Sequence, residues 1–101
     1  MKNHRTHELE SWHHTESELA NEIATSIIDD EAREFLLRPT LDCLAEVKSV
    51  LLRNAVSAST PADANRWYEI AELELGTARK QLLRAKELVA KYGSSIQLIG
   101  E

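Results

Sequence analysis

The residues best suited to chemistry lie near the N-terminus, where all four histidines fall within the first 14 positions, at His4, His7, His13 and His14. Glu10 and His13 have the Glu-x-x-His spacing that supplies ligands in di-iron helical bundles, because positions i and i+3 lie on the same side of a helix. Such a site needs further carboxylates on facing helices, and the sequence holds no second motif of this kind. Glu10 and His13 could therefore contribute to a metal site only if another subunit completed it, and this is the less favoured interpretation. In the alternative interpretation the histidines are surface residues.

A pair of carboxylates and a basic cluster lie on a helix expected at residues 61–92. Glu69 and Glu72 are one turn apart and could carry out acid–base chemistry if they were buried; in the alternative they belong to a solvated face. The basic cluster consists of Arg79, Lys80, Arg84 and Lys86. It could hold a phosphorylated ligand, or it could pair with residues 7–32, which contain eight acidic residues and no lysine or arginine.

Other catalytic arrangements are missing from the sequence. No Ser-His-Asp or Cys-His combination stands in a strand–turn–helix context. The three glycines are isolated, so the chain has no glycine-rich phosphate loop. The sequence thus predicts no catalytic residue, no cofactor and no enzymatic activity. The single cysteine, Cys43, excludes an intramolecular disulfide and is expected to pack as a small hydrophobic residue in a protein from a reducing compartment.

Composition limits the fold class, the partners and the location. Few glycines, prolines and aromatic residues in 101 positions predict one all-α domain. The formal net charge of −5 argues against duplex nucleic acid as a partner. No apolar run approaches the ~20 residues that a bilayer span requires, and the first 18 residues lack the apolar segment of a signal peptide. We therefore expect no membrane contact and a cytoplasmic location.

One long helix, at residues 61–92, organises the chain. Its apolar residues recur every four and then three positions and form an Ala-rich heptad seam, which consists of Ala64, Tyr68, Ala71, Leu75, Ala78, Leu82, Ala85, Val89 and Tyr92. Alanine at alternate positions would let a partner helix approach closely. Thr60 and Pro61 predict the start of the helix and Gly93 its end. Gly76 is interpreted as a point of close backbone approach.

The N-terminal third is less sharply bounded. Residues 1–6 are expected to form a loose arm. Helical spacing then connects a stripe of apolar residues that Glu16 interrupts, namely Leu9, Trp12, Leu19, Ala20, Ile23, Ala24, Ile27 and Ile28. The helix starts near residue 7 or at a capping box formed by Thr15 and Glu18. Residues 7–38 form one acidic helix, or Asp30 caps a second helix after a turn at residues 29–30. In this second topology the chain has three helices, and the middle one is kinked at Pro39.

Pro39 predicts a break or a kink, because proline cannot donate a backbone hydrogen bond and disfavours helical geometry at the preceding residue. Thr40 would then cap a helix at residues 40–57. This helix should run antiparallel to residues 61–92, since three residues connect the two. At ~1.5 Å per residue it would be about 27 Å long and would leave part of residues 61–92 uncovered. The tail at residues 94–101 is interpreted as a frayed end or as a segment that docks on a neighbouring subunit.

Part of the long helix resembles a known family. It is similar to the second helix of the phage anti-CBASS sponges in two motifs, Arg66-Trp67-x-x-Ile70-Ala71 and Leu82-x-Arg84-Ala85. Members of that family are small helical proteins that assemble into multimers and sequester cyclic oligonucleotides without cleaving them. The resemblance implies a cyclic nucleotide as the ligand. Arg66 and Arg84 would hold it, since guanidinium groups suit phosphates.

The sequence as a whole predicts an antiparallel bundle of three or four helices. Because a chain of this length buries a modest core, we expect a homo-oligomer formed through the Ala-rich seam or through the uncovered part of the long helix. The leading hypothesis is a non-enzymatic interaction or regulatory protein whose partner is a further copy or another protein. The alternatives are a sponge for cyclic oligonucleotides and a metal-binding bundle completed across subunits.

Overall fold

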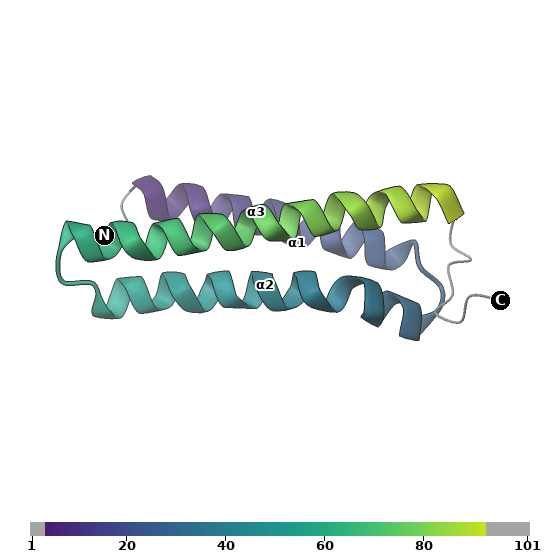
Figure 1. The fold of residues 1–101 in the computed structure, drawn as a ribbon, viewed down its shortest axis with the longest axis horizontal. Helices are drawn as coiled ribbons and strands as arrows, with labels where there is room; N and C mark the ends of the chain where they lie inside the picture. The colour runs from purple at the N-terminus through teal and green to yellow at the C-terminus, as the bar shows by residue number, and fades with distance from the viewer. Residues whose placement is uncertain (1–3, 93–101) are drawn as a thin grey trace.

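Three helices make up the computed structural model, which describes residues 4–92: α1 (His4–Thr25), α2 (Asp30–Ser57) and α3 (Pro61–Tyr92). The chain turns back at residues 26–29 and again at 58–60, at opposite ends of the long axis, and each helix contacts the other two (Figure 1). The described residues contain no strand, so the predicted all-α class is confirmed. Within this part of the chain no helix combines the length and the apolar character that crossing a membrane requires. Gly93 and the expected tail at 94–101 lie outside the described residues.

α1 begins at His4, three residues before the expected position, so residues 4–6 of the expected arm are helical. The rest of that arm, residues 1–3, lies outside the described range. Contacts with α3 explain this early start. Arg5 Nη2 donates to Glu72 Oε2 at 2.6 Å, and the hydroxyl oxygens of Thr6 and Tyr68 lie 2.7 Å apart. The alternative start at Thr15 is wrong, because this residue lies inside α1 and its hydroxyl donates to the carbonyl of Ser11.

The turn at residues 26–29 divides the expected range 7–38 between two helices. Asp29 caps α2 in place of Asp30, since its carboxylate accepts from the backbone N–H of Ala32 at 3.0 Å. Arg33 closes the turn from the other side. Its Nε donates to the carbonyl of Ala24 and its Nη2 to the carbonyl of Ile27. The Ala24 carbonyl, at the end of α1, also accepts from the backbone N–H of Ile27 in the turn, so Arg33 adds a second donor there.

α2 continues through Pro39, so the helix expected at residues 40–57 is the second half of a helix of 28 residues. Pro39 and Phe35 are both exposed. The backbone bond that proline removes therefore lies on the solvent side, where water can reach the Phe35 carbonyl. Thr40 does not cap a helix. It lies fully buried against α3, and its hydroxyl donates to Gln81 Oε1 at 3.0 Å.

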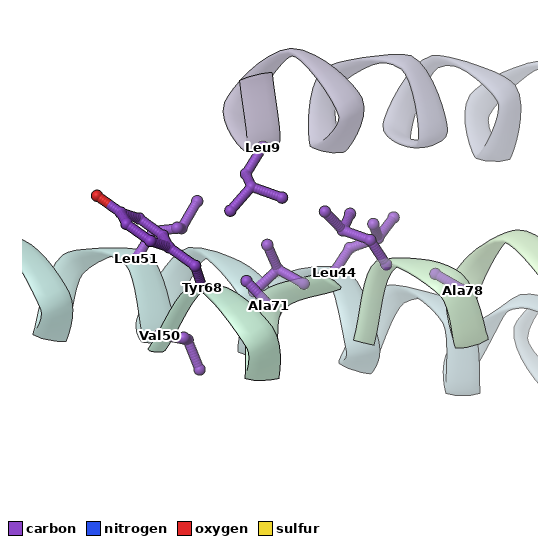
Figure 2. Packing of buried hydrophobic residues seen from close by; sticks show 9 residues of the cluster. Leu9, Leu44, Val50, Leu51, Tyr68, Ala71 and Ala78 are labelled. Atoms are coloured by element: carbon purple, nitrogen blue, oxygen red, sulfur yellow. The ribbon is translucent and has the colours of Figure 1, made fainter. Parts of the chain in front are cut away.

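The buried side chains form two hydrophobic clusters, and each helix contributes to both. The first cluster contains Leu9, Leu44, Val47, Val50, Leu51, Tyr68, Ala71, Leu75 and Ala78. In Figure 2, Leu9 of α1 points toward Tyr68 and Ala71 of α3. The second cluster contains Ala20, Ile23, Ile27, Ala32, Leu37, Leu82 and Ala85. The clusters together hold all three helices in contact along their length.

Most of the predicted seam lies inside these clusters. The buried members are Tyr68, Ala71, Leu75, Ala78, Leu82 and Ala85, while Ala64 and Val89 are partly buried and Tyr92 is exposed. With 28 residues, α2 is about 42 Å long. It accompanies α3 much further than the expected shorter helix would (Figure 1). The other helices of the same chain thus cover the six buried seam positions, which leaves these six without surface for contact with a further subunit.

We expect Ala78→Leu to lower the free energy of unfolding by ~1–3 kcal/mol. Ala78 has no exposed surface, so a larger side chain has to push neighbouring helices apart or take a strained rotamer. Urea denaturation followed by circular dichroism measures the change. Ala90→Leu, at an exposed position of the same helix, is the matched control. Equal losses in the two variants would contradict the close packing at Ala78.

We also expect Gly76→Ala to raise the free energy of unfolding by about 1 kcal/mol. A Cβ atom at Gly76 would meet nothing within 4 Å, so the interpretation of this glycine as a close backbone approach is wrong. Alanine would then improve helix propensity and restrict the unfolded chain without a steric cost. Urea denaturation followed by circular dichroism measures this change in the free energy of unfolding. A loss of stability would show that a neighbour approaches Gly76 after all.

Candidate functional site

A polar layer separates the two hydrophobic clusters. On each helix a polar side chain that is at least partly buried lies between the residues of the first cluster and those of the second: Glu16 on α1, Thr40 on α2 and Gln81 on α3. Thr40 and Gln81 bond to each other. Glu16 is almost completely buried, yet neither of its carboxylate oxygens accepts a hydrogen bond from the described residues. Glu16 is therefore a buried carboxylate whose two oxygens have no hydrogen-bond donor among the described residues.

Arg79 of α3 compensates the charge of Glu16 only in part. Its Nη1 lies 3.6 Å from Glu16 Oε1, which is within ion-pair range but too long for a good hydrogen bond. The Glu16 side chain is 1 % exposed, whereas that of Arg79 is 53 % exposed. A buried carboxylate is costly unless it is both paired and hydrogen-bonded. The arrangement thus leaves a charged acceptor at the bottom of the site and a half-exposed guanidinium above it.

Two surface hollows meet at Arg79. The first has a volume of about 510 Å³ and is lined in part by Glu16, Glu18, Glu22 and Arg79. The second, of about 490 Å³, is lined in part by Glu8, Trp12 and Arg79. The indole Nε1 of Trp12 is buried without a hydrogen-bond partner. The site therefore combines a carboxylate acceptor and an indole donor, both buried, with an arginine that borders both hollows.

The acidic segment and the basic cluster meet here within one chain. Glu16 comes from the acidic residues 7–32 and Arg79 from the predicted basic cluster. The charge pattern predicts Arg79 as part of the basic cluster, whereas Glu16 is expected only to interrupt the apolar stripe. The spacing does predict burial of Glu16, because this residue lies seven positions after Leu9 and four before Ala20, at a core position of that stripe. A charged residue at such a position indicates a site and not merely a gap.

The predicted metal pair lies elsewhere, in a third hollow. Glu10 and His13 line a groove of about 930 Å³ between α1 and α2. His13 Nε2 lies 2.9 Å from the carbonyl oxygen of Leu44, so this nitrogen donates to α2 when it carries the proton. Residues 4–92 bring together no group of three or more His, Cys, Asp or Glu side chains that could hold a metal ion. A metal site at this pair would still have to be completed by another subunit.

The predicted ligand-binding arginines are far apart in one chain. Arg66 and Arg84 are both exposed and lie 18 positions apart on α3, which is about 27 Å at ~1.5 Å per residue. Arg84 Nη1 lies 3.6 Å from Glu87 Oε1. Five helical turns bring the two arginines to the same side of α3 but not to one ligand. A cyclic nucleotide held by both would therefore need arginines from more than one subunit.

The surroundings of Glu69, Glu72 and Cys43 indicate structural and not catalytic roles. Glu72 binds Arg5 while Glu69 is exposed, so the structure does not bury them together for acid–base chemistry. Cys43 packs against the first cluster. Burial raises the pKa of the Cys43 thiol above its ordinary value, and the carboxylates of Glu74 and Asp42 add to this shift. Cys43 is thus kept protonated near neutral pH, which suits a packing role better than a nucleophile.

We expect Arg79→Met to lower the free energy of unfolding at pH 7 by ~1–3 kcal/mol, because the buried Glu16 carboxylate loses its compensating charge. Methionine keeps an unbranched side chain, so the loss reports the charge more than the packing. Lys80→Met, at the exposed neighbouring position, should change stability by less than ~0.5 kcal/mol. Urea midpoints that coincide for the two variants would show that Arg79 does not compensate Glu16.

The chain was compared with protein families, curated proteins and solved structures. No protein-family model, no curated protein and no solved structure matches the chain. The resemblance of residues 66–85 to the phage sponges stays a prediction from the motifs in that segment.

Proposed function

We propose that the protein is a non-enzymatic interaction module that acts as a homo-oligomer, and that its subunits join through the groove between α1 and α2. The observation that carries this proposal is the apolar floor of that groove, formed by Leu51, Leu52 and Ala55. Leu52 is 66 % exposed in the single chain. In this proposal the antiparallel bundle and its heptad seam form the interior of each subunit, and the groove supplies the contact between subunits.

The spacing of the groove residues supports packing against a second pair of helices. On α1 the groove is bordered by Thr6, Glu10, His13 and Ser17, and on α2 by Lys48, Leu52 and Ala55. Both sets recur every four and three positions, which is the spacing that presents one continuous side of a helix to a neighbour. Two facing grooves would thus bring four helices together and cover Leu52 with apolar surface.

Charge supports a second copy with a particular symmetry. Glu10 stands on the α1 wall and Lys48 on the α2 wall of the same groove. A two-fold axis parallel to the groove would place each α1 wall opposite the α2 wall of the other copy, so that Glu10 faces Lys48 of the partner subunit. An axis perpendicular to the helices would instead place each α1 wall opposite the α1 wall of the other copy, where Glu10 would not meet Lys48. Complementary charges fix orientation in an interface, so we favour the first arrangement.

We expect Leu52→Glu to weaken the dimer by about tenfold or more, because the substitution buries a carboxylate in the groove. Native mass spectrometry and sedimentation across a range of protein concentrations measure the change. Leu73→Glu is the matched control: Leu73 is 72 % exposed on α3 and does not line the groove. This variant should keep the assembly of the unchanged protein.

Two outcomes would contradict the proposal. The first is an unchanged protein that stays monomeric at every concentration. The second is a dimer that survives Leu52→Glu and dissociates with Leu73→Glu, which would place the contact on α3. The same spectra would report a bound cyclic nucleotide as added mass, and its displacement by Arg66→Met or Arg84→Met would favour the sponge hypothesis over this one.

A further inference from the structure

We propose that Glu16, together with the acidic hollow beside it, forms a binding site for an organic dication of the diamine class, and that Arg79 covers this site in the absence of the ligand. The inference is independent of the α1–α2 groove, because the site lies between α1 and α3. Three observations carry it: the bonding state of Glu16, the charge of the hollow and the position of Arg79.

The bonding state of Glu16 indicates a ligand that donates hydrogen bonds. Both carboxylate oxygens are buried and neither accepts a hydrogen bond from the described residues. A carboxylate offers about four acceptor positions, and a primary ammonium group brings three donors and a full positive charge. Arg79 supplies charge at 3.6 Å but no hydrogen bond. An ammonium group would supply both and would relieve the cost of the buried acceptor.

The charge of the first hollow indicates a ligand with two positive charges. Glu16, Glu18 and Glu22 line it against the single guanidinium of Arg79. Glu18 and Glu22 are one turn apart on α1 and exposed, and Glu18 Oε1 lies 3.5 Å from His14 Nε2. One ammonium group would bind Glu16 at the bottom while the second would lie near the two carboxylates at the rim. An anionic ligand would meet three carboxylates here.

Arg79 can make room without a movement of the helices. It borders both hollows, and its side chain is 53 % exposed. The second hollow offers the guanidinium a carboxylate, Glu8, and an aromatic ring, Trp12. Both are favourable neighbours for arginine. A rotation of this side chain from the first hollow toward the second would uncover Glu16 and keep Arg79 in favourable surroundings.

Isothermal titration of the full chain with 1,4-diaminobutane tests the site. We expect saturable binding of one ligand per chain, with n-butylamine binding more weakly because it carries one charge. Glu16→Gln should weaken binding by about tenfold or more, the size expected when a hydrogen bond to a charged group is lost. Glu69→Gln removes the same charge from an exposed position outside the hollow, and should change affinity by less than about twofold.

For a second variant we expect tighter and not weaker binding of the diamine. This variant tests the proposal even if Glu16→Gln fails to fold. Arg79→Met removes the group that competes with the ligand, so it should tighten binding several-fold. Weaker binding by Arg79→Met would overturn the proposal. So would equal losses for Glu16→Gln and Glu69→Gln, or heats that sodium chloride reproduces at the same ionic strength, since both would indicate charge attraction without a defined site.

Discussion

The buried carboxylate of Glu16 constrains how α1 can lie against α3. It lies between two hydrophobic clusters, close to the one arginine of α3 that borders both adjacent hollows. A shift of α1 by one turn along α3 would carry the charge into an apolar cluster and away from Arg79. Because an uncompensated buried charge is strongly unfavourable, this one residue penalises every other register of α1 on α3.

Other polar contacts between the helices help to fix their alignment, because the hydrophobic contacts of the core are not directional. Hydrophobic burial is not directional, so a heptad seam tolerates shifts of whole repeats. Hydrogen bonds between the helices disfavour such shifts at two positions along the bundle. His13 contacts the Leu44 carbonyl between α1 and α2, and Thr40 donates to Gln81 between α2 and α3. The clusters supply most of the stabilisation, while the polar contacts select one alignment.

α1 borders the surface hollows on which the two proposals are based. All three hollows are lined by its residues: the two on either side of Arg79 and the groove shared with α2. The apolar side of α3 is used inside the bundle, although the seam makes it the most conspicuous helix in the sequence. The acidic character of α1 then has two consequences, since it compensates Arg79 within the chain and leaves carboxylates at the rims of the hollows.

Features that depend on neighbours along the chain could be predicted from the sequence alone. The all-α class, the start of α3 and the packing of Cys43 follow from composition, capping and helical spacing; Thr60 does accept from the Asp63 N–H. Only the tertiary structure decided where α1 begins, that α2 passes Pro39 and that Glu16 is buried. Helical periodicity shows which residues share a side of a helix. Whether a charge on that side is tolerated depends on a residue such as Arg79, which the fold brings near from a distant part of the chain.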